Sequence, residues 1–238
     1  MIVVTIIAIL AAVAVPRLVS ARVSANENAT IATLRTVVAA QAQLISSAAI
    51  DANSDGGGEA GYFGELSGAS PYRVWTVGGP AIGPAGQVLD PTYLPPVFQV
   101  VQSDGTDGVV QYQGYYFKMF LPDDSPTAPF GAVPEATAGG NSGGTLPGAN
   151  NAEIFWCCYA WPVQLAKTGS RAFMVNQGGE IVATANVPSQ PGGAYNGLAR
   201  VPAFDAAFSA AGDMSSEPAL AISGLAAQDG LTWTPVGN

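Results

Sequence analysis

The hydrophobic and polar positions of residues 1–50 predict one long helix with two unlike halves. An apolar run extends from Met1 to Val15, interrupted only by Thr5, and Pro16 closes it. Residues 17–50 contain no glycine and no further proline, and they are rich in alanine, leucine, arginine and glutamine, which favour helix. We expect a helix of roughly 48 residues, about 70 Å long at a rise of about 1.5 Å per residue.

The two halves of this helix require different surroundings. Residues 1–16 are apolar on every side, so they must lie in lipid or in a packed apolar core. The side chains expected there are Ile2, Val3, Val4, Ile6, Ile7, Ile9, Leu10, Val13, Val15 and Pro16. Residues 17–50 carry an apolar stripe at steps of three and four residues, which predicts packing against a folded domain. The stripe consists of Ile31, Leu34, Val38, Ile45 and Ala48, with Gln41 in line. The opposite, polar face carries Arg22, Asn26, Glu27, Thr33 and Gln43.

The composition changes abruptly after Ile50, which divides the chain into a helix and a head domain of residues 51–238. Every glycine, every aromatic residue and all but one proline follow this point, as is typical of a turn-rich globular region. Residues 1–50 have a net charge of +2, and the remainder of the chain has −11. An acidic head argues against nucleic acid as a partner, because binding to phosphates needs a basic surface.

The head shows the pattern of an antiparallel sheet with long loops, so the expected fold class is α+β. Strands are predicted at 97–102 and 109–122 around the turn 103–108, at 153–163, in a hairpin over 171–185, and at 231–236. In 109–122 aromatic residues fall on both faces, and one set is expected to pack on the stripe of the long helix. We expect surface loops at 70–96 and 123–152, and a short helix at 202–212.

A candidate metal-binding loop follows the long helix. Oxygen-bearing side chains stand at the first, third, fifth and ninth places of a segment whose sixth residue is Gly56, which resembles the start of a calcium loop. The candidate ligands are Asp51, Asn53, Asp55, Gly57 and Glu59. Tyr62 stands where the bidentate glutamate of such a loop belongs. The alternative is a turn in which the same residues bond only to the backbone.

Neither the cysteines nor the serine motif of the head indicates an enzyme. Cys157 and Cys158 are adjacent, and four states are open to them: buried thiols, a vicinal disulfide, bridges between subunits, or a weak metal pair. Residues 140–144 match G-x-S-x-G, but they lack the required strand and helix, and the chain has no histidine to serve as base. We expect no catalytic residues.

The N-terminal segment resembles that of type IV pilins and of the pseudopilins of type II secretion. The resemblance rests on MIVVTIIAILAAVAVPRL followed by ANENATIATLRTVVAAQAQ, about the first 45 residues. It implies a pilin-like fold with the long helix packed on the sheet. It also implies a prepilin peptidase that removes a leader, methylation of the new N-terminus, and an inner-membrane assembly machinery. The apolar half-helix would anchor the precursor in the bilayer and then form the filament core.

One family feature has no counterpart in residues 1–15, namely a glutamate near the mature N-terminus. Either the numbering begins about six residues inside the mature chain, which we favour, or this subunit lacks the charge. The apolar run of 15 residues is also short for a bilayer crossing, which needs about 20. A signal peptide is disfavoured, because a basic segment in front and a small-residue cleavage site behind are missing.

The expected function is therefore a structural subunit of an extracellular helical filament on the cell surface, a homo-oligomer with a role such as cell adhesion. The alternatives are a pseudopilin of a secretion system and a membrane-tethered binding domain that does not polymerise. In the polymer, Pro16 is expected to produce a bend or a loss of helical order near Ala11–Pro16, because proline removes one backbone hydrogen bond.

Overall fold

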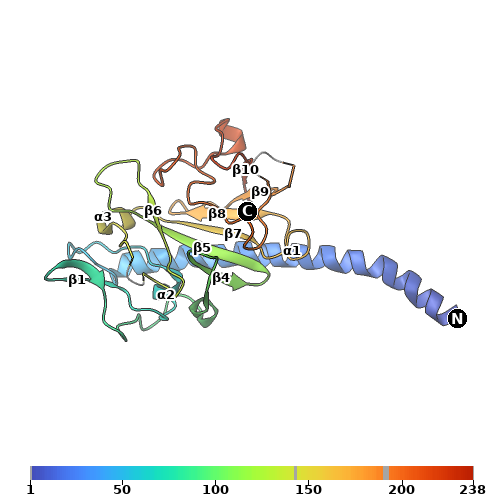
Figure 1. Ribbon diagram of the computed structural model, residues 1–238, viewed down its shortest axis with the longest axis horizontal. Helices are drawn as coiled ribbons and strands as arrows, with labels where there is room; N and C mark the ends of the chain where they lie inside the picture. The colour runs from blue at the N-terminus through green and yellow to red at the C-terminus, as the bar shows by residue number, and fades with distance from the viewer. Residues whose placement is uncertain (1, 142–143, 190–192, 238) are drawn as a thin grey trace.

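The computed structural model describes residues 2–141, 144–189 and 193–237. Its dominant element is α1 (Ile2–Ser47), which projects far beyond the head at its N-terminal end and lies along the head at its C-terminal end (Figure 1). The helix length agrees with the sequence prediction to within two residues. Pro16 lies inside α1, and the helix of the single chain runs through it unbroken, with a gentle curve in the projecting part (Figure 1).

Among the described residues, the head is built on an antiparallel sheet of eight strands, so the α+β prediction is confirmed. Along the sheet the order is β10-β9-β8-β7-β5-β4-β3, and β6 pairs with β5 beside β4. The strands are β3 (Val101–Ser103), β4 (Gly108–Tyr112), β5 (Tyr115–Pro122), β6 (Ala132–Pro134), β7 (Cys157–Pro162), β8 (Ala172–Asn176), β9 (Val182–Thr184) and β10 (Trp233–Pro235). A separate hairpin joins β1 (Arg73–Thr76) to β2 (Gly79–Ile82). Short helices complete the head: α2 (Phe63–Leu66), η1 (Pro96–Gln99), α3 (Ala149–Ala152) and η2 (Ala221–Ser223).

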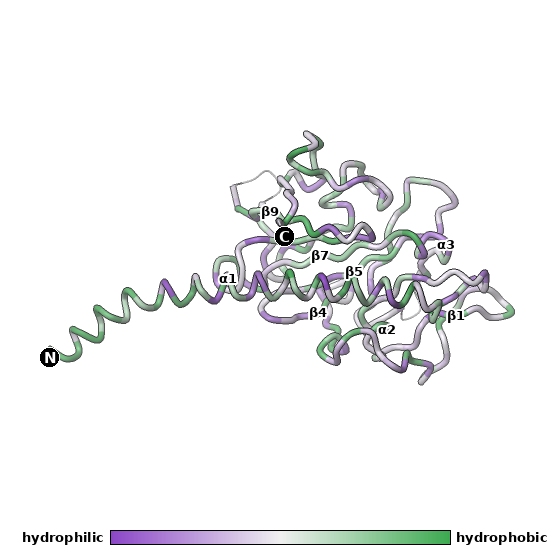
Figure 2. Tube along the Cα trace, turned by 180° about the vertical axis from the view of Figure 1, so that it is seen from behind, coloured by the Kyte–Doolittle hydropathy of each residue, from purple (hydrophilic) through white to green (hydrophobic). Residues whose placement is uncertain are grey.

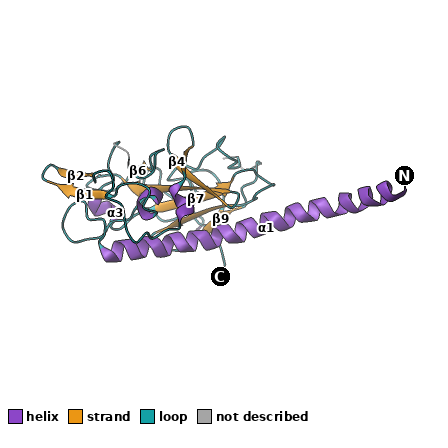
Figure 3. Ribbon diagram, turned by 90° about the horizontal axis from the view of Figure 1, so that it is seen from below, coloured by secondary structure: helices purple, strands orange, loops and turns teal. Residues whose placement is uncertain are grey.

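Both faces of the sheet are covered, and strand alternation sorts the side chains between two cores. One core packs the sheet on α1, and it joins Leu34, Val37 and Leu44 to Phe117 and Phe173. The other core lies on the opposite face, beneath the C-terminal segment that follows β9. It contains Trp161, Met174, Phe208 and Trp233 among others. Figure 1 shows this segment and α1 on opposite sides of the strands, and Figure 3 shows α1 lying beneath the sheet.

Several predicted elements differ in the structure. Residues 109–122 are not one strand, because Gln113 (φ 47°) and Gly114 (φ 80°) form the turn of a hairpin between β4 and β5. The segment 70–96 contains β1 and β2, and 123–152 contains β6 and α3. Residues 202–212 form turns instead of a helix, with Phe208 bridged to Pro218. The 171–185 hairpin is confirmed as β8 and β9, and 231–236 supplies β10, which extends the sheet.

Candidate functional site

The most unusual surface of the molecule is the projecting part of α1, residues 2–22, which we call the arm. Every residue of the arm is exposed, including Ile2 (78%), Val4 (68%) and Leu10 (64%). Figure 2 shows the arm as a mainly hydrophobic tube separate from the head. Soluble proteins seldom expose a large contiguous apolar surface without a partner for it. By length and composition α1 could cross a membrane, a criterion that a signal sequence near the N-terminus also meets.

The predicted arm residues all occupy this exposed surface. In the single chain none of them meets the packed core that their apolar character requires. They are Ile2, Val3, Val4, Ile6, Ile7, Ile9, Leu10, Val13, Val15 and Pro16.

The arm leaves the head at a polar clamp formed by Asn26 and Glu27, two residues expected on the polar face of the helix. Glu27, predicted on the exposed face, is 8% exposed. Its Oε2 accepts from Arg171 Nε at 2.7 Å, and its Oε1 accepts from the backbone amides of Ser170 and Arg171. Beside it Asn26 Nδ2 donates to the carbonyl of Thr168 at 2.8 Å. The spacing contained the signal, because Glu27 stands four residues before Ile31 and thus continues the buried stripe.

A second clamp lies near the C-terminal end of α1, at Gln41. Its side chain is fully buried, and its amide bonds in both directions to Gly61. Nε2 donates to the Gly61 carbonyl at 2.7 Å, and Oε1 accepts from the Gly61 amide at 2.9 Å. The buried backbone amide and carbonyl of Gly61, which follows the helix, thereby both have a hydrogen-bond partner in a helix side chain. Together the two clamps and the apolar stripe fix the direction in which the arm projects.

The candidate metal loop is an Asx-rich turn in the structure. Asp51, Asn53 and Asp55 each accept a bond from a backbone amide of the loop, at Gly56, Asp55 and Gly57 respectively. Glu59 faces the opposite way, because its carboxylate accepts from Arg73 at 2.8 Å and from the Ala52 amide at 2.6 Å. Within the described part of the chain, no group of three or more His, Cys, Asp or Glu side chains is placed to hold a metal ion.

Glu59 belongs instead to a buried ion-pair cluster that was not predicted. Arg73 is 1% exposed and bonds to both Glu59 and Glu65, at 2.8 and 3.0 Å, and also to the carbonyl of Ala60. Burial raises the pKa of Glu59, and the adjacent Arg73 opposes that rise. The cluster joins the segment after α1 to α2 and β1, so it holds the loop region of the head together.

Cys157 and Cys158 are both free thiols, and they point to opposite faces of β7. Cys158 lies in the core beneath α1, and Cys157 lies in the core beneath the C-terminal segment. Burial raises the pKa of both thiols. Neither side chain is accessible to a partner in this conformation.

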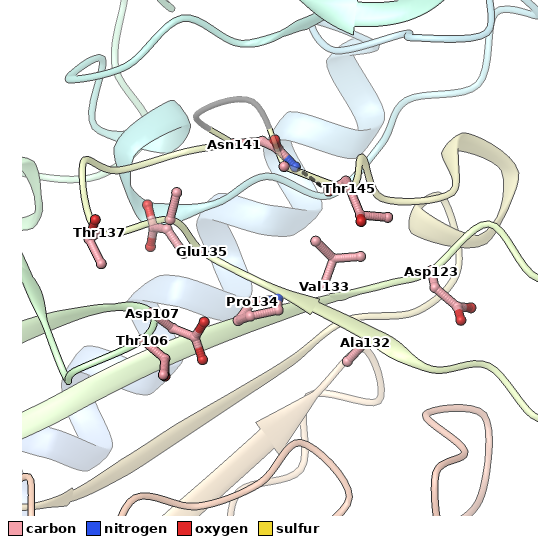
Figure 4. Close-up of a pocket in the computed structure, with 12 residues that line it drawn as sticks. Thr106, Asp107, Asp123, Ala132, Val133, Pro134, Glu135, Thr137, Asn141 and Thr145 are labelled. Atoms are coloured by element: carbon pink, nitrogen blue, oxygen red, sulfur yellow. Dashed lines mark hydrogen bonds between the residues drawn. The ribbon is translucent and has the colours of Figure 1, made fainter.

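A hollow of about 560 Å³ lies beside β6, and Figure 4 shows its lining. Hydroxyl and carboxylate side chains line it, among them Thr106, Asp107 and Thr145. Asp107 is held by Lys118 Nζ at 2.8 Å. Two residues of the G-x-S-x-G segment, Ser142 and Gly143, lie outside the described residues. The polar groups of the hollow are hydrogen-bond acceptors and hydroxyls, and the chain has no histidine to act as a base beside them. We assign no reaction to the hollow.

Glu135 borders this hollow and is the most unusual carboxylate of the head. It is fully buried, and its Oε1 accepts from the amides of Gly64 and Gly140 at 2.7 and 2.9 Å. Oε2 has no hydrogen-bond partner among the described residues. Burial raises the pKa of Glu135 to about 7 despite these two bonds. With this pKa the carboxyl is about half protonated at pH 7 and neutral in more acidic solution, which lowers the cost of burying it.

No protein-family model, curated protein or solved structure matches this chain.

Proposed function

We propose that this protein is the structural subunit of an extracellular helical filament of the type IV pilus kind, and that it polymerises through the arm. One observation carries the proposal: the helical residues 2–22 are all exposed, those before Arg17 are apolar except for Thr5, and the helix continues without a break into a part clamped to the head. The exposed apolar arm requires a partner surface. Because the arm continues a helix that is clamped to the head, it is held out in a fixed direction, as an assembling subunit needs.

The energetics of the arm favour burial in lipid or in a polymer. Transferring a large aliphatic side chain from water to an apolar environment contributes about 1.5–3 kcal/mol. The arm carries nine such side chains between Ile2 and Val15, so exposure to water is strongly unfavourable. In a filament the arms of other copies replace lipid. The interface joins different surfaces of each copy, so it need not close and can continue indefinitely.

The proposal includes a membrane-bound precursor before assembly. Lipid would surround the arm at that stage, and a prepilin peptidase and an inner-membrane assembly machinery would act on the chain. Two other functions use the same arm. A pseudopilin would form a short polymer within the cell envelope, and a tethered binding domain would remain monomeric in mild detergent.

The test is electron microscopy of filaments sheared from producing cells, combined with mass spectrometry of the subunit. We expect long fibres made of this chain, and a methylated N-terminal residue in the mature subunit. Short polymers confined to the cell envelope would favour the pseudopilin. A detergent-soluble monomer without fibres would refute polymerisation and favour the tethered domain.

A charge placed in the arm provides the matched mutational test. We expect Leu10→Asp to abolish filaments, because a carboxylate would then lie within an apolar assembly interface or in lipid. Ser24→Asp introduces the same charge on an exposed position of α1 just beyond the arm. Filament yield from sheared cells should remain measurable for Ser24→Asp and fall below detection for Leu10→Asp. Equal yields would show that the arm is not the assembly surface.

A further inference from the structure

An apolar groove of about 510 Å³ follows one flank of α1 where the helix lies on the head. Its α1 side is formed by Val38, Ala42 and Ile45, and its other side by Ile154 and Trp156. Ile154 is 58% exposed, although it stands directly beside the sheet strand β7. The groove therefore offers an apolar surface alongside α1, with Ser46, Glu153 and Gln177 as its polar lining.

The groove ends at carboxylates that have no cationic partner. Glu153 lines it, and the carboxylates of Asp55 and Asp51 lie close enough to contribute to the raised pKa of Glu153, after burial. Across the described ranges, no ion pair joins these three residues to lysine or arginine. The carboxylate of Glu153 accepts a long hydrogen bond of 3.4 Å from Asn53 Nδ2. Asp51 Oδ1 is buried, and no described residue is its hydrogen-bond partner.

The arm carries the complementary charges. Arg17 and Arg22 follow its apolar run, are exposed, and form no ion pair with the part of the chain that the structure describes. The arm thus presents apolar residues followed by arginine, and the groove presents apolar residues followed by carboxylates. In the arm and along the groove alike, the apolar groups come first and the charged groups follow toward the C-terminal end of α1.

We propose that this groove is the seat for the arm of a second copy of the chain, with Arg17 of that copy against the carboxylates of Asp51, Asp55 and Glu153. The inference rests on the proposed filament and specifies its subunit contact. The arm of the second copy lies parallel to α1 of the first. Arg17 of the second copy is then level with Ser46 of the first, and Val13 of the second is level with Ala42 of the first. This register shifts neighbouring copies by about 29 residues, or about 43 Å along the helix axis.

A second copy fits this seat better than lipid does. Anionic lipid headgroups would meet the same three carboxylates and be repelled. Only a cationic group following an apolar rod satisfies both parts of the groove, and the arm of this chain has that order. The opposite charges also select the parallel orientation, because a reversed arm would place Arg17 away from the carboxylates.

Paired cysteines test the register in the assembled full-length protein. The variant Ala42→Cys with Val13→Cys should form a ladder of covalent oligomers on mild oxidation. The control Ala42→Cys with Ile6→Cys places the arm cysteine seven residues away, about 10 Å along the helix, and should form none. Within one chain the paired cysteines are too far apart to join. Cys157 and Cys158 are fully buried and give little background, which the wild-type protein measures.

The outcomes separate the two proposals. If wild-type cells produce no polymer by electron microscopy, the proposed function fails. If filaments form and the Val13 pair does not exceed the Ile6 pair, the seat is wrong and the filament stands. A ladder specific to the Val13 pair supports the seat.

Charge exchange tests the ionic end of the seat. Arg17→Glu should lower filament yield about tenfold, because it sets like charges against each other. Adding Glu153→Arg to that variant should restore most of the yield. Adding Glu217→Arg, an exposed site on the C-terminal segment, should not restore it. Equal yields for the two double variants would overturn the pairing.

Discussion

Two kinds of buried charge occur in the head at the scale of single residues. Arg73 forms ion pairs with two glutamates, whereas Glu135 has only backbone amides as partners and one oxygen without a partner among the described residues. No hydrophobic or polar periodicity could have revealed either arrangement, since Glu59, Glu65, Arg73 and Glu135 come from four separate segments that meet only after folding.

Glu135→Gln should stabilise the head at alkaline pH. The pKa of Glu135 is raised from 4.5 to about 7 by burial, so the folded head prefers the protonated form. As pH rises above 4.5 the unfolded chain ionises first, and stability falls until about pH 7. The full penalty corresponds to about 3 kcal/mol. Urea unfolding at pH 5 and pH 8 should show the variant gaining about 1–3 kcal/mol at pH 8 and much less at pH 5.

Glu180→Gln removes an exposed carboxylate and reports the effect of net charge alone. Of the charged side chains nearby, Glu65 also raises the pKa of Glu135. Should Glu135→Gln and Glu180→Gln show the same pH dependence as the wild-type protein, Glu135 would not be the titrating group.

Arg73→Met should be among the most destabilising substitutions of the head. It leaves Glu59 and Glu65 fully buried without a cation, which typically costs about 3–5 kcal/mol. Chemical denaturation measures the loss. Adding Glu59→Gln and Glu65→Gln to this variant removes the unpaired charges and should recover part of the stability. A loss below about 1 kcal/mol for Arg73→Met would contradict the role given to the cluster.

At the scale of elements, the long helix is the best-predicted part of the molecule. Its composition and apolar stripe determine both its length and the face that packs. The stripe residues Leu34 and Gln41 are fully buried, and Val38 and Ile45 are partly buried against the same core. What could not be predicted is the partner of each polar side chain in that face, because Gly61 and Arg171 are 20 and more residues away in sequence.

Gln41→Ala should destabilise the docking of α1 by about 1–3 kcal/mol, because it leaves the buried amide and carbonyl of Gly61 without partners. Gln43→Ala is the matched control, since it makes the same truncation on the exposed face of the same helix. Urea denaturation of both variants measures the difference. Similar midpoints for the two variants would show that the Gln41 clamp contributes nothing.

The strands were predictable where hydrophobic residues flank a strong turn signal, and otherwise they were not. The β8–β9 hairpin follows from Asn176–Gly179, and the register places Phe173 opposite Ala183. The Gln113–Gly114 turn was missed because the residues around it continue the alternating pattern of a single strand. Residues 202–212 were mistaken for a helix because alanine and phenylalanine suit helix spacing, whereas tertiary contacts with β10 and β7 hold them in turns.

At the scale of the whole molecule, the arm and the head differ in what they contribute to the stability of the fold. The arm makes no buried contact with the head, so the folding of residues 51–238 against the rest of α1 does not depend on it. The head carries the acidic excess of the chain, and the arm carries more than half of its exposed large hydrophobic side chains.

Removing residues 1–22 should therefore leave the thermal midpoint of the head unchanged within about 2 °C, and should give a monomer that needs no detergent. Differential scanning calorimetry and size-exclusion chromatography measure both properties against the full chain in mild detergent. A midpoint lowered by 5 °C or more would mean that the arm supports the head, contrary to its complete exposure.

The two clamps on α1 also determine how the molecule would respond to mechanical force. A load applied to the arm along the helix axis would act in shear, so that the Glu27 and Gln41 clamps and the apolar stripe would share it at the same time. A sideways load would instead peel the helix from the sheet, breaking the Glu27–Arg171 pair first and then each contact in turn. The head should thus resist tension along its long axis far better than bending at the point where the arm emerges.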